Sequence, residues 1–211
     1  VATILKSNYG FETIIIKNAN HEELVSEISQ LNKKINSQDH LLIYYAGHGT
    51  LDDKEGFWLP IDAKLENESK WLSHNFIIRK IKKIKAINIL LIADSCFSGA
   101  LLSRGIGSID GSKQNNSAID LFLKTKSRIV ISSGGLKPVL DGGGGDHSIF
   151  ARMFINALTT NTKPMTSYNL FNKINQKVTE QALDYDIEQT PEIGTLERAG
   201  HVGRDFVFLP Q

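Results

Sequence analysis

The sequence has little cysteine to cross-link the chain and little excess charge to attach it to charged surfaces. It has one cysteine in 211 residues, and its 24 Lys and Arg nearly balance 23 Asp and Glu, which leaves a net charge of +1. A single cysteine excludes an internal disulfide framework or a cysteine-rich metal site, and it favours a reducing, cytoplasmic location. The near-zero net charge argues against general binding to nucleic acid or anionic membranes, which scales with the number of phosphates neutralised.

Long hydrophobic runs are also absent. The longest apolar stretches, residues 87–93 and 41–46, are far too short to span a bilayer, and no signal peptide is recognisable. The chain is nevertheless 41% hydrophobic and long enough to bury a core of its own. We therefore interpret residues 1–211 as a single globular domain that does not associate with membranes.

Short β-branched segments alternate with stretches of helical period. This alternation is typical of a mainly parallel α/β sheet covered by helices. The predicted strands are 12–16, 41–45, 88–93, 128–132 and 206–209. The predicted helices are 21–35, 74–83, 148–158 and 167–183, the first preceded by a capping box of Asn20 and Glu23 and the third capped by Asp146 or Ser148.

Two stretches interrupt the alternation. Residues 103–118 are rich in Gly, Ser and Asn without an apolar period, so we expect an exposed loop that is open to cleavage. Residues 136–146 contain four consecutive glycines, but they lack the Lys and the Ser or Thr of a phosphate-binding loop. Nucleotide binding is therefore not expected.

The lone cysteine and one histidine share the same sequence context. Cys96 follows the strand-like run N-I-L-L-I-A, and His48 follows L-L-I-Y-Y-A. If the two strands are neighbours in a parallel sheet, both side chains emerge at one edge, about 5 Å apart across the sheet. A thiol within reach of an imidazole is an activated nucleophile. Either residue alone is more often a buried inert thiol or an ordinary histidine, but their shared position favours a catalytic pair.

These motifs resemble those of a known enzyme group. G-H-G after one hydrophobic strand and D-S-C-F-S-G after the next, about 50 residues later, resemble the caspase-like clan of cysteine peptidases. D-S-C in place of Q-A-C resembles the metacaspase branch and its bacterial relatives, the orthocaspases. The resemblance extends from about residue 11 to the C-terminus, through G-F-W-L-P-I-D-A, V-I-S-S-G-G, D-G-G-G-G-D-H-S-I-F-A and G-R-D-F-V-F-L-P.

The resemblance implies a fold and a reaction. The implied fold is a caspase-like three-layer sandwich, whose first strand lies before Val1, so the sequence is expected to be a trimmed or processed chain. The implied activity is that of a cysteine-type endopeptidase, in which Cys96 attacks the scissile carbonyl and His48 protonates the leaving amine. Backbone N–H groups of Gly49 and Cys96 would hold the oxyanion. The bond chemistry needs no metal or other cofactor, and no EF-hand-like motif indicates the calcium activation that is known in many metacaspases.

Asp94, two residues before the cysteine, indicates cleavage after basic residues. A carboxylate there can pair with Arg or Lys on the acyl side of the cut, although it can also simply hydrogen-bond the turn. Metacaspases have a second acidic pocket residue upstream of this sequence, for which Asp141 is a substitute, and some have Ser at the position of Ala46. The strand 128–132 and residues 133–135, with Ser132 and Ser133, resemble the edge that pairs with the extended substrate.

The loop 103–118 lies where this clan divides its larger and smaller halves. Arg104 and Lys113 are the predicted self-processing sites there, with Lys124, Lys126 and Arg128 following. The expected partners are protein or peptide substrates, together with regulatory domains or an activating protein, and bacterial relatives suggest stress, defence or regulated cell death.

Two alternatives of other classes remain. One is a catalytically idle interaction module of the same fold, whose pocket stays closed until a partner binds. The other, ranked last because a phosphate fingerprint is absent, is a doubly wound domain that binds a small ligand.

Overall fold

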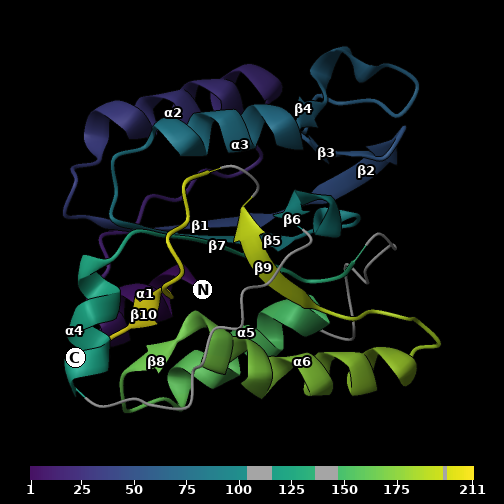
Figure 1. The fold of residues 1–211 in the computed structure, drawn as a ribbon. Coiled ribbons are helices and arrows are strands. Elements are labelled where there is room, and N and C mark those ends of the chain that lie inside the picture. Colours follow the sequence, from purple (N-terminus) through teal and green to yellow (C-terminus); the bar gives the residue numbers. More distant parts are fainter. Residues whose placement is uncertain (104–115, 136–146, 197–198) are drawn as a thin grey trace.

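A five-stranded sheet forms the centre of the molecule (Figure 1). The computed structural model describes residues 1–103, 116–135, 147–196 and 199–211. The strand order is β1-β5-β7-β9-β6, with bounds His40–Ala46, Asn88–Asp94, Ser127–Ser132, Glu192–Leu196 and Leu102–Ser103. Strands β1, β5 and β7 are parallel, whereas β9 runs antiparallel to both β7 and β6. The fold is therefore the predicted α/β sandwich with a mainly parallel sheet, extended by an antiparallel pair that the sequence did not predict.

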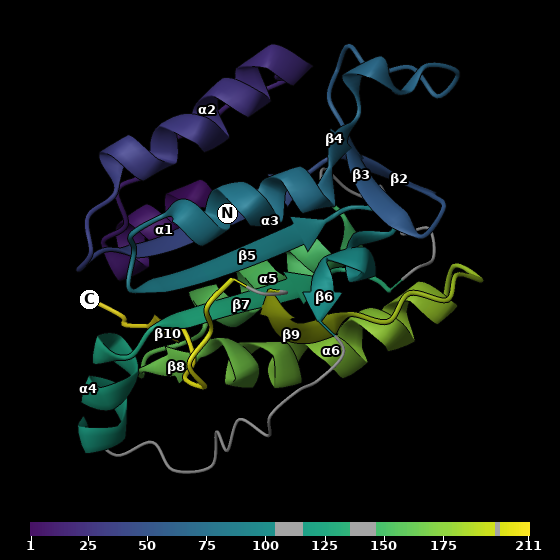
Figure 2. The ribbon, with the colours of Figure 1, turned by 45° about the horizontal axis from the view of Figure 1, so that its top comes forward.

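Helices cover both faces of this sheet (Figure 2). Helices α2 (His21–Lys34) and α3 (His74–Lys83) lie on one face, and α1 (Ala2–Tyr9), α5 (Ile149–Thr159) and α6 (Ser167–Leu183) lie on the other. Strand β5 contributes side chains to the hydrophobic cores on both faces of the sheet, because Leu90 and Ile92 pack in one core cluster while Ile89 and Leu91 pack in the other. This burial on both faces explains why the predicted strand is a continuous apolar run.

The remaining elements are short and lie around the sheet. A three-stranded antiparallel sheet and a two-stranded pair were not predicted as such, although the strand predicted at 206–209 contains one of their members. The remaining bounds are β2 (His48–Asp52), β3 (Glu55–Leu59), β4 (Leu72–Ser73), β8 (Met165–Thr166), β10 (Val207–Phe208), α4 (Asn116–Lys124) and the 3-10 helices η1 (Glu68–Lys70) and η2 (Ser98–Leu101). Within the described residues, no helix is long and apolar enough to cross a membrane.

The four predicted helices are confirmed to within a few residues. Helix α2 begins at the predicted capping box, in which Asn20 accepts a hydrogen bond from the Glu23 N–H (3.0 Å) and the Glu23 carboxylate accepts one from the Asn20 N–H (2.9 Å). Helix α5 is capped by Ser148, whose hydroxyl accepts from the Ala151 N–H at 2.9 Å. Local signals thus define where these helices begin.

The predicted strand at 12–16 is wrong. Residues 10–18 have no regular helix or strand, and Ile14, Ile15 and Ile16 are 66%, 64% and 46% exposed. A β-branched run forms a strand only when a neighbouring strand pairs with its backbone N–H and C=O groups. Among the described residues no strand pairs with this segment.

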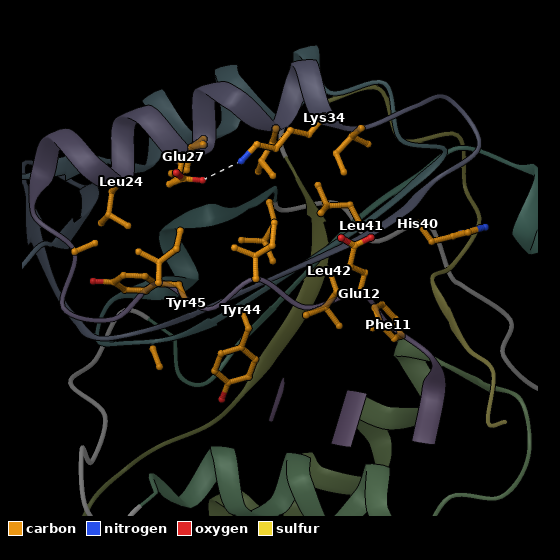
Figure 3. A pocket seen from close by; sticks show the side chains of 18 of the residues that line it. Phe11, Glu12, Leu24, Glu27, Lys34, His40, Leu41, Leu42, Tyr44 and Tyr45 are labelled. Carbon is orange, nitrogen blue, oxygen red and sulfur yellow. Dashed lines mark hydrogen bonds and ion pairs between the residues drawn. The ribbon is translucent and has the colours of Figure 1, made fainter. Parts of the chain in front are cut away.

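A cavity of about 1270 Å³ separates this segment from the outer edge of β1 (Figure 3). Its walls come from residues 10–19, from the inner side of α2 and from β1 itself, as shown for Phe11, Leu24 and Leu42. Strand β1 pairs with β5 on one side, and its residues 41–45 are only half-buried, whereas every residue of β5 is buried. The apolar sequence of β1 is thus that of an interior strand, but the strand lies at the edge of the sheet.

Candidate active site

The carboxyl ends of β1 and β5 bring the predicted pair of residues to one edge of the sheet. The two strands are parallel and in register, with Ala46 opposite Asp94. His48 and Cys96 each lie two residues beyond this register pair. The chains stay together past the strands, because the Gly47 N–H donates to the Asp94 carbonyl oxygen at 3.3 Å. The strands that precede His48 and Cys96 are therefore neighbours, which is the condition that the sequence analysis set for the pair.

Gly49 approaches the backbone of Cys96 very closely. A Cβ at position 49 would lie 2.3 Å from the carbonyl oxygen of Cys96 and 3.3 Å from that of Phe57. Both contacts are to backbone atoms, which cannot move aside as a flexible side chain could. Glycine is therefore required at this position, and the backbone of Gly49 lies beside that of Cys96.

His48 is exposed at the start of β2, and Tyr45 holds the turn that leads to it. The Tyr45 hydroxyl donates a hydrogen bond to the His48 carbonyl oxygen at 2.8 Å. The Tyr45 ring is stacked on Trp58, with 3.9 Å between ring centroids and 7° between planes. Sequence reasoning assigned no role to Tyr45, because a tyrosine in an apolar strand carries no signal beyond burial.

Cys96 is half-buried and is followed by a sharp turn. Phe97 has a φ of 57°, in the left-handed region, and the short 3-10 helix η2 begins directly after it. A non-glycine residue in this region is uncommon and must be held by its surroundings. Ser98 contributes to this, since its hydroxyl donates to the Ser95 carbonyl oxygen at 2.9 Å. The segment directly after Phe97 is therefore a short 3-10 helix.

Asp94 is 7% exposed, and two hydroxyl groups bind its carboxylate. Its Oδ2 accepts a hydrogen bond from the Tyr44 hydroxyl at 3.1 Å and one from the Ser148 hydroxyl at 2.6 Å. Burial, and then the charge of Asp94 and the hydrogen bond to it, raise the pKa of Tyr44 well above its usual value. The sequence placed Ser148 only as a helix cap and did not single out Tyr44, since neither has a local signal for a contact with Asp94.

Three other predicted substrate-binding residues differ in their exposure. Ala46 is exposed at the end of β1, whereas Ser132 and Ser133 are completely buried. The Ser132 hydroxyl contacts the Ser98 hydroxyl at 2.5 Å, and the Ser133 N–H donates to the Ala93 carbonyl oxygen at 3.0 Å. Both serines thus stabilise the base of the site, and their side chains face the interior.

Strand 128–132 itself offers no free edge to a substrate, whereas the predicted role of residues 133–135 stays a prediction. Strand β7 pairs with β5 on one side and with β9 on the other, so both of its edges are occupied. Strand β9 comes from residues more than sixty positions downstream, and its antiparallel pairing has no signal in the sequence around β7. Only residues beyond Ser132 leave the sheet.

Some predicted residues cannot be placed. Asp141, Arg104 and Lys113 lie outside the described residues, as does most of the loop 103–118. Among the basic residues that follow this loop, Lys124 and Lys126 are exposed, but Arg128 is completely buried in the sheet. Arg128 is therefore inaccessible to a protease in the folded protein.

Within the described part of the chain, no group of three or more His, Cys, Asp or Glu residues could hold a metal ion.

Comparisons with known proteins give a consistent result. The model of a peptidase family described as "Caspase domain" matches residues 1–198. Among solved structures, caspase-1 from Spodoptera frugiperda has a similar fold, with a TM-score of 0.62 over 98% of this chain and 77% of that chain, at 18% sequence identity. A search of curated proteins found no match.

Proposed function

The chain belongs to the caspase-domain family of cysteine-type endopeptidases, and from this membership we propose that Cys96 and His48 are its catalytic dyad and that Asp94 directs cleavage to basic residues. One observation carries the proposal. The register of β1 and β5 brings the histidine, the cysteine and the Gly49 backbone to the same sheet edge. A nucleophile, an acid–base group and oxyanion donors have to meet in this way for amide hydrolysis.

The reaction proceeds in two steps. The Cys96 thiolate attacks the scissile carbonyl carbon, and the negative charge moves to the carbonyl oxygen, which accepts hydrogen bonds from the N–H groups of Gly49 and Cys96. The C–N bond then breaks as His48 donates a proton to the leaving amine. In the second step a water molecule gives a proton to His48 and attacks the thioester, which releases the carboxylic acid and restores the Cys96 thiolate beside protonated His48.

Asp94 supplies the specificity in this proposal. A carboxylate pairs with a guanidinium through two parallel hydrogen bonds and with an ammonium as a point charge. Its position two residues before Cys96 places it beside the acyl side of the cut. Cleavage after Arg or Lys would assign the protein to the metacaspase-like branch, whereas cleavage after Asp would assign it to the caspase type.

The test is hydrolysis of fluorogenic peptides that end in Arg, Lys or Asp, with and without calcium. The wild type should cleave after Arg and Lys, and Cys96→Ala should lower the rate by about a thousandfold or more. Asp94→Asn, which keeps the shape of the side chain, should lower kcat/KM for Arg peptides by about a hundredfold. Cleavage after Asp alone would disprove the specificity, while leaving the dyad intact.

If the wild type cleaves no peptide, labelling of Cys96 with an iodoacetamide probe at neutral pH distinguishes an inactive module from an enzyme that lacks its activator. Fast labelling, which Asp94→Asn preserves and His48→Ala slows, would indicate an active thiolate that lacks its activator or calcium. Slow labelling at the rate of an ordinary thiol would support the idle interaction module instead, since reactivity follows the thiolate fraction.

Self-processing is part of the same proposal. An enzyme that cleaves after basic residues would cut its own loop at Arg104 or Lys113, and the substrates it meets in a stress, defence or cell-death response would be proteins with exposed basic segments. Intact mass after incubation should show fragments ending at these residues in the wild type and none in Cys96→Ala. Equal masses for both proteins would remove self-processing from the proposal.

A further inference from the structure

Two hydroxyl groups from distant parts of the chain converge on Asp94. Tyr44 belongs to β1 and precedes Asp94 by 50 positions, and Ser148 follows it by 54 positions at the start of α5. Both donate to the same carboxylate oxygen, Oδ2. Two donors on one oxygen, arriving from different elements, fix the rotation of the carboxylate about its Cβ–Cγ bond.

The rotation of this carboxylate matters for the substrate that we assign to it. A guanidinium is planar, and its paired N–H groups bind a carboxylate well only when the two groups are nearly coplanar. An ammonium has three donors around a single nitrogen and imposes no such plane. A fixed Asp94 carboxylate therefore favours arginine over lysine, whereas a freely rotating one would discriminate less.

Both hydroxyl donors are themselves held by α5. Ser148 caps this helix through the Ala151 N–H, and the Tyr44 ring packs on Phe154 with 5.6 Å between ring centroids. Ser148 thus donates one hydrogen bond and accepts another, which uses its hydroxyl in both directions. The N-terminal end of α5 also favours a negative charge beside it.

We propose that Tyr44 and Ser148 are positioning residues that hold the Asp94 carboxylate in the plane that a substrate arginine requires. The proposal rests on the proposed function, because it assumes that Asp94 binds the basic side chain. It extends that function by assigning the arginine preference to hydroxyl groups that do not themselves touch the scissile bond.

The alternative is a structural role, in which the hydroxyls only satisfy a buried carboxylate. A structural role predicts that their loss lowers the hydrolysis of all substrates in parallel. A positioning role predicts a loss that is confined to substrates with a planar cation. The two roles are therefore separated by comparing an arginine peptide with the same peptide carrying citrulline, which has nearly the same shape but no charge.

The experiment measures kcat and KM for arginine, lysine and citrulline peptides with the wild type, Tyr44→Phe and Ser148→Gly. Phenylalanine keeps the ring on Phe154, and glycine is a fair helix cap that lacks the hydroxyl. Ser148→Thr keeps a hydroxyl and is the rescue variant. Tyr9→Phe and Thr166→Gly are matched controls, because they remove a buried tyrosine hydrogen bond (2.8 Å, to the Leu158 carbonyl) and the cap of α6 away from Asp94.

Tyr44→Phe and Ser148→Gly should each raise KM for the arginine peptide about tenfold with little change in kcat, since each removes one hydrogen bond to a charged group. The lysine peptide should lose less and the citrulline peptide nothing, and Ser148→Thr and both controls should behave like the wild type. Parallel losses for all three peptides, or unchanged arginine kinetics, would overturn the positioning role. A wild type that does not prefer arginine or lysine over citrulline would instead overturn the proposed specificity, and the positioning role with it.

Discussion

Tyr45 is the residue whose contacts best explain how the His48 turn keeps its shape. Its hydroxyl binds the His48 carbonyl oxygen, its ring lies on Trp58, and a Cβ at Gly47 would come within 2.8 Å of the Tyr45 hydroxyl oxygen. The turn thus wraps tightly around one side chain. A small shift in this turn would misplace the imidazole, and small misplacements of catalytic groups are costly.

The variant Tyr45→Phe should lower kcat about tenfold while leaving KM nearly unchanged, because it removes one hydrogen bond that orients the turn and touches no substrate group. The ring remains stacked on Trp58, so the melting temperature should fall little. Steady-state kinetics with an arginine peptide and a thermal melt check both expectations. A kcat equal to that of the wild type would mean that the turn is held by other contacts.

His74 is a second informative residue, because it makes the protein sensitive to acid. It is 2% exposed beside Trp58, neither ring nitrogen has a hydrogen-bond partner among the described residues, and burial lowers its pKa to about 3. The unfolded chain binds a proton at this residue near pH 6.5, whereas the folded protein does not bind it until about pH 3. The free energy of unfolding therefore decreases as the pH falls from 6.5 towards 3.

Urea unfolding at pH 7 and pH 5 tests this with the wild type and His74→Phe. Between these pH values the wild type should lose about 2 kcal/mol more stability than the variant, as expected for one proton taken up only by the unfolded chain. Comparing the two proteins cancels the contributions of His40 and His201, whose pKa values are also lowered by burial. Equal losses in both proteins would show that His74 is protonated in the folded state.

On the scale of the secondary-structure elements, the side chain of Arg128 joins β7 to the segment that follows α3. This guanidinium is completely buried and donates to the carbonyl oxygens of Ile84, Ala86, Ile87 and Ser127 at 2.7 to 3.2 Å. Burial lowers its pKa to about 10, which leaves it charged at neutral pH. Three carbonyl groups of the segment after α3 therefore accept hydrogen bonds from one side chain of β7.

Replacing Arg128 by Met should lower the free energy of unfolding by about 3 kcal/mol or more, because the carbonyl groups of four residues each lose a hydrogen bond from the guanidinium. Arg128→Lys should be intermediate, since an ammonium keeps the charge but has three donors. Urea unfolding measures both, with Arg79→Met, at an exposed position of α3, as the control. A cost below about 1 kcal/mol would mean that water replaces the guanidinium.

On the scale of the whole molecule, the outer edge of β1 is an open edge of the central sheet, because no strand pairs with it among the described residues. The cavity beside this edge lies between β1 and residues 10–19, and Ile14 and Ile16 are among its lining residues. Without a partner, an exposed strand edge invites pairing with another chain.

The chain of residues 1–211 should accordingly associate with itself as its concentration rises. Ile14→Lys, which places a charge in the cavity beside the open edge, should reduce the association. Leu183→Lys is the matched control, because Leu183 on α6 is 57% exposed and Ile14 is 66% exposed. Sedimentation velocity measures the association state, and an equal effect of both variants would mean that the β1 edge is not the contact.

The sequence alone determined the elements whose signals are local. The capping box at Asn20, the helical periods and the continuous apolar runs of β1, β5 and β7 predicted these elements, because capping and burial patterns act over a few residues. It also predicted that the strands before His48 and Cys96 lie in one parallel sheet, where they are neighbours, and the catalytic pairing of the two residues stays a prediction.

Only the tertiary structure decided which distant elements are neighbours. Strand β9 lies beside β7, and two hydroxyls bind Asp94, although the segments involved are far apart in the chain. Residues 12–16, in contrast, have no strand partner among the described residues. Such contacts depend on how helices and strands pack together, and packing leaves no fixed spacing in the sequence. The residues of the proposed dyad could therefore be nominated from the sequence, whereas the residues that contact their turns and Asp94 could not.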